Sequence, residues 1–298
     1  MKNFPFKKID AFATGGSTGN PAGAIYLDAP GDITPDEMQR LALELKGFVS
    51  EVGFLNPQED GRFGLRYYSS EREVAFCGHA TIAILYDLIQ NRPDLIVRDS
   101  VRVQTSRGTL RAYNRIREED AVFIEAPRPV FRSAPIPMSD ISEALGTNAE
   151  DLRADLPTAK VNAGLETLIV PAAGLGAILS LAPDIERLKA FCLMHGIDII
   201  TVFSEETSLP GSGFRTRVFA PTFGYLEDPA TGSGNSAFGF YLLKYLGWNA
   251  EALTIEQNGS AAHPNIVKLR FQLDQEGAGM VLFGGSGTVR ISGEYRLI

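Results

Sequence analysis

The sequence predicts an α+β protein in which one strand-rich unit with a central helix occurs twice in tandem. Three pairs of similar segments predict this repeat, and the members of each pair lie about half of the 298-residue chain apart. Because all three pairs occur in the same order, chance similarity explains the set less well than it explains any single pair. We place the join at residues 115–120 (RIREED), a charged stretch that is also typical of a solvated turn. The predicted halves are residues 1–118 and 119–298, with the final strand able to cross back to the first half.

The first pair is a helix that leads into a strand. Residues 37–43 (EMQRLAL) have apolar side chains at helical spacing, and they precede the strand-like residues 52–55 (VGFL). In the second half, Arg187 and Leu188 lie in a similar helix that precedes residues 199–203 (IITVF). The order of helix and strand is therefore the same in both halves.

The second pair is a glycine-containing loop that opens an apolar helix. Residues 73–79 (EVAFCGH) precede a helix that we expect over residues 80–89. Residues 227–233 (EDPATGS) precede a second helix, expected over residues 237–246. These two helices are the candidates for the central helix of each half.

The third pair is a β-rich run that closes on a glycine turn, at residues 101–108 and 253–259. Other stretches give expectations for single regions. Residues 127–137 are rich in proline and predict an extended edge segment. The uncharged stretch 167–183 falls short of the ~20 apolar residues that a membrane helix needs, so we expect a buried strand, a turn and a second strand there. Residues 284–287 (GGSG) are expected to form a loop.

Composition and charge exclude several classes of protein. With 44% hydrophobic and 21% charged residues, the chain is typical of globular proteins, which excludes disorder, collagen and coiled coils. A net charge of −8 without a basic cluster lacks the cationic surface that nucleic-acid binding requires. Two cysteines are too few for a disulfide framework, and the first residues contain no apolar run that could act as a signal peptide. We therefore expect a cytoplasmic protein without nucleic-acid or membrane partners.

Two short loops predict an anion site. Residues 77–81 (CGHAT) and 231–235 (TGSGN) lie where the chain turns into a helix, and a helix start carries unpaired N–H groups and about half a positive charge. Glycine there lets a ligand approach the backbone closely. In the alternative interpretation, Gly78 and Gly232 are only turn residues and Ser233 is only an N-cap. Two related loops at matching positions favour a shared site for a small anionic substrate.

Three titratable side chains near these loops are candidate catalytic groups. Glu51 stands at the head of an apolar strand, where desolvation raises the pKa of a carboxyl toward neutrality, as a general acid or base requires. His79 lies at the start of the first helix, and Asp228 lies shortly before Ser233. Each also has a structural interpretation: an exposed strand-end Glu51, a hydrogen-bonded His79, and an Asp228 that opens a turn.

Other chemistries fit the sequence less well. His79, His195 and His263 are isolated and show no metal-ligand spacing, so no metal site is predicted. The chain also has no dinucleotide-binding, P-loop or nucleophile-elbow motif. Cys77 is either a nucleophile or acid, or a small buried thiol, which is the commoner case. Cys192, between two apolar residues of a predicted helix, is expected in the core.

Several motifs together resemble the phenazine-biosynthesis PhzF-like isomerase family. They are residues 18–21 (TGNP), 50–54 (SEVGF), 73–81 (EVAFCGHAT), 217–221 (RVFAP) and 227–233 (EDPATGS). The closing residues 281–298 also resemble the final strands of that family. The resemblance covers essentially the whole chain, and CGHAT followed by EDPATGS is a specific combination.

The resemblance implies a diaminopimelate-epimerase-like fold with two pseudo-symmetric halves. Each half would be an antiparallel sheet or barrel wrapped around a central helix, with the active site in the cleft between the halves. The resemblance also implies a homodimer and proton-transfer catalysis without a cofactor. Carried over residue by residue, it assigns the acid/base carboxylate to Glu51, polar contacts with the substrate and the migrating proton to His79, Asp228 and Ser233, and backbone N–H donors to Gly78 and Gly232.

The related epimerases use thiols at both loop positions as their two bases. Here Cys77 occupies one position and Thr231 the other, so a two-thiol mechanism is not available. Residues 234–236 (GNS) are smaller and more flexible than the Ala-bearing version of the family, which bears on how the second helix begins.

We therefore predict an isomerase that shifts a proton on a small carboxylic acid, with Glu51 as the general acid/base. Two alternatives are kept open. One is a non-catalytic protein of the same fold that binds a small anion, and the other is an amino-acid racemase that uses the single thiol of Cys77.

Overall fold

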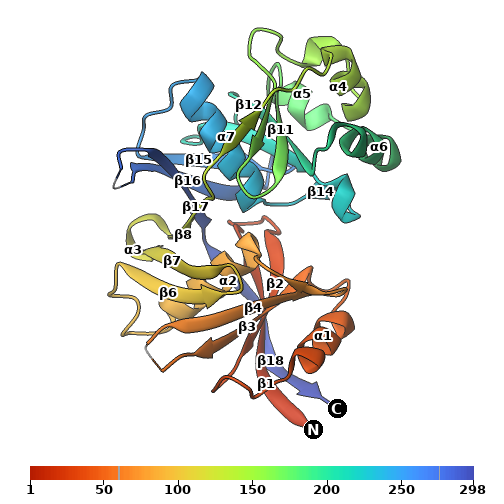
Figure 1. The fold of residues 1–298 in the computed structure, drawn as a ribbon. Coiled ribbons are helices and arrows are strands. Elements are labelled where there is room, and N and C mark those ends of the chain that lie inside the picture. Colours follow the sequence, from red (N-terminus) through yellow and green to blue (C-terminus); the bar gives the residue numbers. More distant parts are fainter. Residues whose placement is uncertain (60, 275) are drawn as a thin grey trace. The chain divides into compact units, whose positions relative to one another are not determined.

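The computed structural model describes residues 1–59, 61–274 and 276–298, and the chain forms two compact units (Figure 1). The first unit contains Met1–Ala13, Thr18–Glu125 and Gly284–Ile298, and the second contains Thr14–Ser17 and Ala126–Phe283. The predicted join falls inside the first unit, where residues Ile116–Glu119 form the short helix α3. The units divide after Glu125 because the strand that follows α3 pairs with the strand before it.

The first unit is a sheet around one central helix, α2 (Gly78–Gln90). Its strands are β1 (Lys2–Ala11), β2 (Asn20–Tyr26), β3 (Glu51–Pro57), β4 (Phe63–Ser69), β5 (Glu73–Val74), β6 (Ser100–Thr105), β7 (Gly108–Arg115), β8 (Ala121–Glu125) and β18 (Gly287–Leu297). They pair in the order β18–β1–β2–β3–β4–β6–β7–β8, and β5 also pairs with β4. Because β1 and β18 are antiparallel partners, the two chain termini lie together in this unit (Figure 1).

Helix α2 is the core of the first unit. Residues Ala80 to Ile89 are all buried, and the helix contacts β1, β2, β3, β8 and β18. A helix surrounded by strands must be apolar on most of its surface, which explains why most of residues 80–89 are apolar. Asp87 is the buried exception. Its carboxylate accepts hydrogen bonds from Lys7 Nζ at 2.7 Å and from the Tyr26 hydroxyl at 2.5 Å, so the buried charge is paired.

The second unit repeats this arrangement around α7 (Gly232–Tyr245). Its strands are β9 (Val130–Arg132), β10 (Ala159–Asn162), β11 (Glu166–Pro171), β12 (Ile199–Ser204), β13 (Phe214–Phe219), β14 (Glu227–Asp228), β15 (Ala252–Gln257) and β16 (Asn265–Leu273), and β17 (Gly279–Gly285) leads back to the first unit. They pair in the order β9–β10–β11–β12–β13–β15–β16, and β14 pairs with β13. Helix α7 contacts β10, β11, β12 and β16.

Further helices pack outside the two sheets. In the first unit, α1 (Pro35–Glu44) contacts β3 and β4. The second unit has α4 (Met138–Leu145), α5 (Leu175–Ser180) and α6 (Ile185–His195), together with the short 3₁₀ helices η1 (Ala149–Asp151) and η2 (Pro221–Phe223). Residues of α4, α5 and α6 share one hydrophobic cluster with β11 and β12. Cys192 lies in this cluster, as expected for a core residue.

The strand pairing confirms the predicted duplication. In each unit a pair of parallel strands is joined through outer helices, β2 with β3 and β11 with β12. A second parallel pair is joined through the central helix, β4 with β6 and β13 with β15. The short strands before the central helices also match, because β5 pairs with β4 and β14 pairs with β13. The sheets are thus mixed and not purely antiparallel, since helical crossovers bring strands back in the same direction.

Two local predictions are wrong. Residues 175–180 form helix α5 where a second strand was expected, and Ile178 packs in the cluster formed with α4 and α6. The glycines at 284–287 do not form a loop, because Gly284 and Gly285 are the last two residues of β17 and Gly287 begins β18. A Cβ at Gly284 would lie 2.3 Å from the carbonyl oxygen of Val122, so glycine is needed for the close approach of the two strands.

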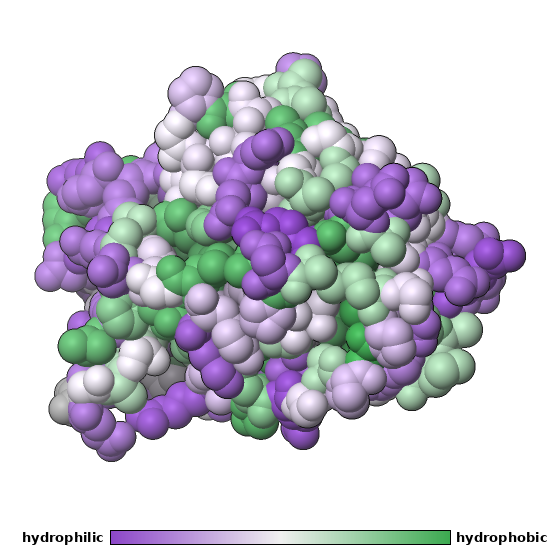
Figure 2. Space-filling view, turned by 90° about the horizontal axis from the view of Figure 1, so that it is seen from above, coloured by the Kyte–Doolittle hydropathy of each residue, from purple (hydrophilic) through white to green (hydrophobic). Residues whose placement is uncertain are grey.

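The surface gives no single dominant feature on the face that Figure 2 shows, where hydrophilic and hydrophobic residues are interspersed. Exposed large apolar side chains include Leu193, Met194 and Phe223, and scattered exposure of this kind is ordinary for folded proteins. Among the helices of the described residues, none has the length and apolar character needed to cross a membrane. The cytoplasmic location and the homodimer stay predictions.

Candidate active site

Glu51 is a shielded carboxyl at the first position of β3. Its backbone lies between two strands, opposite Ala22 of β2 and Ser69 of β4. The side chain is 24% exposed, and burial raises the pKa of its carboxyl to about 7, partly offset by a hydrogen bond with Cys77. Desolvation disfavours the charged form, so this carboxyl exchanges its proton near neutral pH. The interpretation of Glu51 as an exposed strand-end residue is therefore wrong.

His79 and Cys77 lie beside Glu51 at the start of α2. The Nε2 atom of His79 is 3.3 Å from Glu51 Oε2, and the Sγ atom of Cys77 is 3.5 Å from His79 Nδ1. Cys77 is the N-cap residue of the helix, and His79 belongs to its first turn. The ligand atoms of the three residues lie within 4.8 Å of one another, so together they could hold a metal ion. Spacing along the chain did not reveal this group, because Glu51 comes from a different element.

A buried tyrosine, Tyr67, supports the first turn of α2 through a hydrogen bond with Thr81. The Thr81 hydroxyl donates to the carbonyl oxygen of Cys77 at 2.6 Å, and the Tyr67 hydroxyl lies 2.6 Å from the same Thr81 oxygen. Burial raises the pKa of Tyr67 well above its usual range, so this phenol stays protonated. The contacts fix the Cys77 carbonyl and with it the direction of the loop that carries His79.

Asp228 and Thr231 build the corresponding start of α7. Asp228 ends the short strand β14, opposite Val218 of β13, and Thr231 is the N-cap residue of α7. The Thr231 hydroxyl donates to Asp228 Oδ2 at 2.5 Å. Gly232 is the first helical residue and Ser233, half-buried, is the second. The interpretation of Ser233 as the N-cap is therefore wrong by two positions.

Gln257, the last residue of β15, supports the loop before α7, and the sequence alone did not indicate this role. Its fully buried amide makes four hydrogen bonds. Its Oε1 accepts from the Thr231 backbone N–H at 2.8 Å and from Asn235 Nδ2 at 2.7 Å. Its Nε2 donates to the Asp228 carbonyl at 2.9 Å and to the Thr231 hydroxyl at 3.0 Å. A single side chain from β15 thus holds both ends of the loop, and no local motif marks such a residue.

Asn235, one of the residues 234–236 (GNS) that differ from the Ala-bearing version of the family, has a structural role at the start of α7. Its Nδ2 donates to the carbonyl oxygen of Thr231 at 2.9 Å, at the position where Thr81 bonds Cys77 in the first unit. The helix still begins at Gly232, so the smaller residues do not delay it. A Cβ at Gly234 would lie 3.0 Å from the Thr201 hydroxyl, which leaves little space for alanine there.

The two central helices lack the side-chain caps that two outer helices, α1 and α6, have, and α4 and α5 lack such caps as well. Thr34 caps α1 in a capping box, and the Asp184 carboxylate accepts from two N–H groups of α6. By contrast, neither Cys77 at α2 nor Thr231 at α7 makes a side-chain cap hydrogen bond. The N–H groups of these first turns are therefore not consumed by their own cap residues, which suits a role in holding an anion.

Replacing Gly232 with alanine should destabilise the protein by about 1–3 kcal/mol. The new Cβ would lie 2.2 Å from the ring of Phe283, which is itself buried, so the ring or the first turn of α7 must move. Gly176 provides the matched control, because it lies in helix α5 with nothing within 4 Å of a Cβ. Urea unfolding should show Gly176→Ala unchanged or slightly stabilised, and equal midpoints for the two variants would contradict the close approach at Gly232.

The raised pKa of Glu51 makes stability depend on pH. Between the ordinary value of 4.5 and about 7, the folded protein keeps a proton that the unfolded chain has lost. The free energy of unfolding therefore falls as pH rises through this window, by up to about 3 kcal/mol. Glu51→Gln removes that cost, so the variant should be more stable than the wild type at about pH 8 and similar at about pH 4.5. Urea unfolding at both pH values tests this, and a difference that does not grow with pH would contradict it.

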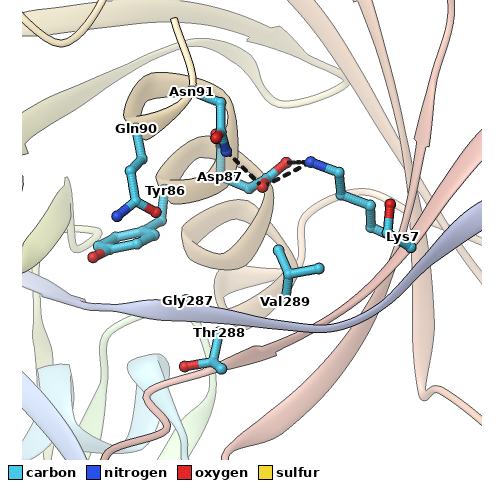
Figure 3. Close-up of a pocket in the computed structure, with 9 residues that line it drawn as sticks. Lys7, Tyr86, Asp87, Gln90, Asn91, Gly287, Thr288 and Val289 are labelled. Atoms are coloured by element: carbon cyan, nitrogen blue, oxygen red, sulfur yellow. Dashed lines mark hydrogen bonds and ion pairs between the residues drawn. The ribbon is translucent and has the colours of Figure 1, made fainter.

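A hollow of about 520 Å³ lies at the other end of α2, away from its N-terminal loop (Figure 3). Lys7, Tyr86, Asp87 and Asn91 are among the residues that line it. The Lys7 ammonium points at Asp87 and bonds both carboxylate oxygens, and Asn91 bonds the same carboxylate (Figure 3). Because its cation is already paired, this hollow does not offer the anion site that the sequence predicts.

The structure therefore brings Glu51, Gly78 and His79 together in the first unit, with Cys77 beside them. It brings Asp228, Gly232 and Ser233 together in the second unit, with Gln257 beside them. Each predicted loop is complete within its own unit. The meeting of both loops on one ligand remains a prediction.

Comparison with known proteins gives the family. The family model PhzC-PhzF, described as phenazine biosynthesis-like protein, matches residues 9–293. The chain belongs to the PhzC-PhzF family. A Bacillus subtilis (strain 168) relative named "uncharacterized isomerase YfhB" is 31% identical over 302 residues, which covers 100% of this chain and 99% of that protein. The prediction of an enzyme of the PhzF-like isomerase family is confirmed.

Solved structures with a similar fold confirm the fold class. The PhzF family protein of Bacillus anthracis has a TM-score of 0.88 and 25% identity, with 100% of both chains covered. A hydroxyproline epimerase from Agrobacterium vitis has a TM-score of 0.61 and 14% identity, with 99% of this chain and 91% of that chain covered. The fold is therefore the diaminopimelate-epimerase-like fold, with two similar halves.

Proposed function

We propose that this PhzC-PhzF family member is a cofactor-independent isomerase that shifts a proton on a small carboxylic acid. In this proposal the substrate lies in a cleft between the halves, where both loops meet it. Glu51 removes a proton from one carbon and returns it at another position. The observation that carries the proposal is the shielded carboxyl of Glu51, whose pKa is raised to about 7 by burial.

A carboxyl with that pKa suits both directions of a proton shift. At neutral pH the charged and neutral forms are both populated, so the same group can accept a proton and then donate it. A positioned acid/base contributes a rate factor of about 10²–10⁴. The Nε2 atom of His79 lies 3.3 Å from Glu51 Oε2, so His79 is placed to contact the substrate on the same side as the carboxylate.

The helix starts are proposed to hold the negative charge of the substrate. The backbone N–H groups at Gly78 and Gly232 belong to first turns whose cap residues make no side-chain cap hydrogen bond. N–H donors directed at a developing oxyanion are each worth about 10²–10³ in rate. Asp228 is held by the Thr231 hydroxyl, and Ser233 follows in the same turn, so both are proposed to contact the substrate.

The rate factors of the acid/base group and of the N–H donors together limit the class of substrate. Acid/base and oxyanion terms of this size suffice for a C–H bond that is already activated, and they do not suffice for an unactivated one. We therefore propose an acid with an allylic proton or a proton next to a carbonyl group. The substrate is anionic and small, and neither nucleic acid nor a membrane takes part. The enzyme is proposed to act in the cytoplasm as a homodimer.

Solvent exchange tests the proposal. The purified chain is incubated in D₂O with a panel of β,γ-unsaturated and 2-amino carboxylic acids, and NMR follows deuterium into carbon positions. Incorporation that depends on Glu51 is the expected result. Thermal stabilisation by an acid without incorporation would instead favour the non-catalytic anion-binding protein. Incorporation that survives Glu51→Gln but is lost in Cys77→Ser would favour the single-thiol racemase.

A further inference from the structure

Three side chains of the first unit form a mixed set of metal ligands. Glu51 contributes a carboxylate from the head of β3, Cys77 a thiol from the N-cap of α2, and His79 an imidazole from its first turn. The His79 Nε2 atom lies 3.3 Å from Glu51 Oε2 and 3.9 Å from Cys77 Sγ. All three ligand atoms lie within 4.8 Å of one another, so one atom could contact all three.

The separations match one face of a zinc tetrahedron. Zinc binds sulfur at about 2.3 Å and nitrogen or oxygen at about 2.0–2.2 Å, which places tetrahedral ligand atoms about 3.3–3.6 Å apart. The observed 3.3 Å and 3.9 Å lie close to this range, and the Cys77 Sγ atom, which is 3.5 Å from His79 Nδ1, must move toward Nε2 for the three atoms to face one ion. A thiolate with an imidazole and one carboxylate selects zinc over magnesium or calcium, which prefer oxygen ligands alone.

The charges of Cys77 and Glu51 and the burial of the Glu51 carboxylate also support a divalent cation such as Zn²⁺. The thiolate of Cys77 and the carboxylate of Glu51 together balance a divalent cation, so the partial positive charge at the start of α2 opposes binding only weakly. The Oε2 atom of Glu51 is buried and accepts no hydrogen bond from the described residues, although His79 Nε2 lies nearby. A bound cation would give this oxygen a strong partner.

We propose that Glu51, Cys77 and His79 form a Zn²⁺ site, with the fourth coordination position left for water or a ligand carboxylate, and that Zn²⁺ bound there inhibits the enzyme. The inhibition rests on the proposed function, because the metal takes the Glu51 oxygen that would accept the substrate proton. Binding displaces the thiol proton of Cys77 to solvent. Chelators would then activate preparations of this protein.

Calorimetry without substrate tests the site itself. The full chain is stripped with a chelator, dialysed and titrated with ZnCl₂, with MgCl₂ as the comparison ion. The expected result is one Zn²⁺ per chain and no binding of Mg²⁺. Cys77→Ser should weaken Zn²⁺ binding by about 100-fold or more, since even changes outside the ligand shell cost about 10–100-fold. Cys192→Ala and His195→Asn remove another thiol and another imidazole and should leave binding unchanged.

X-ray absorption at the zinc edge decides the ligand set without relying on variants. One sulfur at about 2.3 Å is expected in the loaded wild type. Absence of binding, or a shell without sulfur, would overturn the site. Deuterium exchange on an accepted acid should stop at saturating Zn²⁺ and return with chelator, and exchange that continues would overturn the inhibition. If no acid supports exchange in the stripped protein, the proposed function fails while the zinc measurements still decide the site.

Discussion

Glu51→Gln should reduce turnover on an accepted acid by about 10²–10⁴-fold while the protein stays folded. Glutamine keeps the shape of the side chain but cannot take a proton from carbon at neutral pH. Because Glu51 is shielded from bulk water at the head of β3, water cannot efficiently take over the proton transfer when the carboxyl is removed. Steady-state rates of isomerisation, measured beside circular dichroism spectra, check both halves of this expectation.

Glu294→Gln is the matched control for the loss of turnover. Glu294 is an exposed glutamate of β18 in the same unit, so its replacement makes the same chemical substitution without touching the site. Its rate should equal that of the wild type. If Glu51→Gln retains near-normal turnover on an acid that the wild type isomerises, Glu51 is not the acid/base.

Gln257→Leu should lower stability by about 3 kcal/mol or more and lower turnover with it. The leucine would leave the Thr231 backbone N–H, the Asp228 carbonyl and the Asn235 amide without the partner that they share. A buried polar group that loses its partner costs about 1–3 kcal/mol, and here several lose it together. Urea unfolding measures the stability, and the rate under native conditions measures the effect on the loop.

Gln90→Leu is the control for this second variant, because Gln90 is exposed at the end of α2. Its stability should stay within about 0.5 kcal/mol of the wild type. A stronger test measures kcat and KM separately. Since Gln257 holds Asp228 and Thr231 rather than the substrate, kcat should fall in the folded fraction. An unchanged kcat with only a lower stability would mean that Gln257 has a purely structural role.

The repeat allowed most of the fold to be predicted from sequence. Alternation and helical spacing are local properties, and β3, α2 and β12 begin and end within two residues of the expected positions, whereas α7 begins at Gly232, five residues before the expected start. Helix α5 was missed because its six residues are too few to show a helical period. The close contact of Gly284 with Val122 was also missed, since it depends on which strands become neighbours.

The site was predictable only as far as its signals are local. Glu51 was found because an acidic residue heads an apolar strand, and Gly78 and Gly232 because glycine opens a helix. The contact of His79 and Cys77 with Glu51 depends on β3 lying beside the start of α2. The role of Gln257 likewise depends on pairing, because its position opposite Thr216 brings it to the start of α7. Long-range pairing of this kind leaves no motif.

The most direct test is to titrate the Glu51 carboxyl itself. The protein is labelled with ¹³C at glutamate side-chain carboxyls, and the Glu51 signal is assigned as the one missing from Glu51→Gln. Its chemical shift is then followed by NMR across the pH range in which the protein stays folded. The shielded position of Glu51 predicts a pKa of about 7. A midpoint near the ordinary value of about 4.3 would show an open, solvated carboxylate and would contradict the assignment of Glu51 as the proton-transfer group.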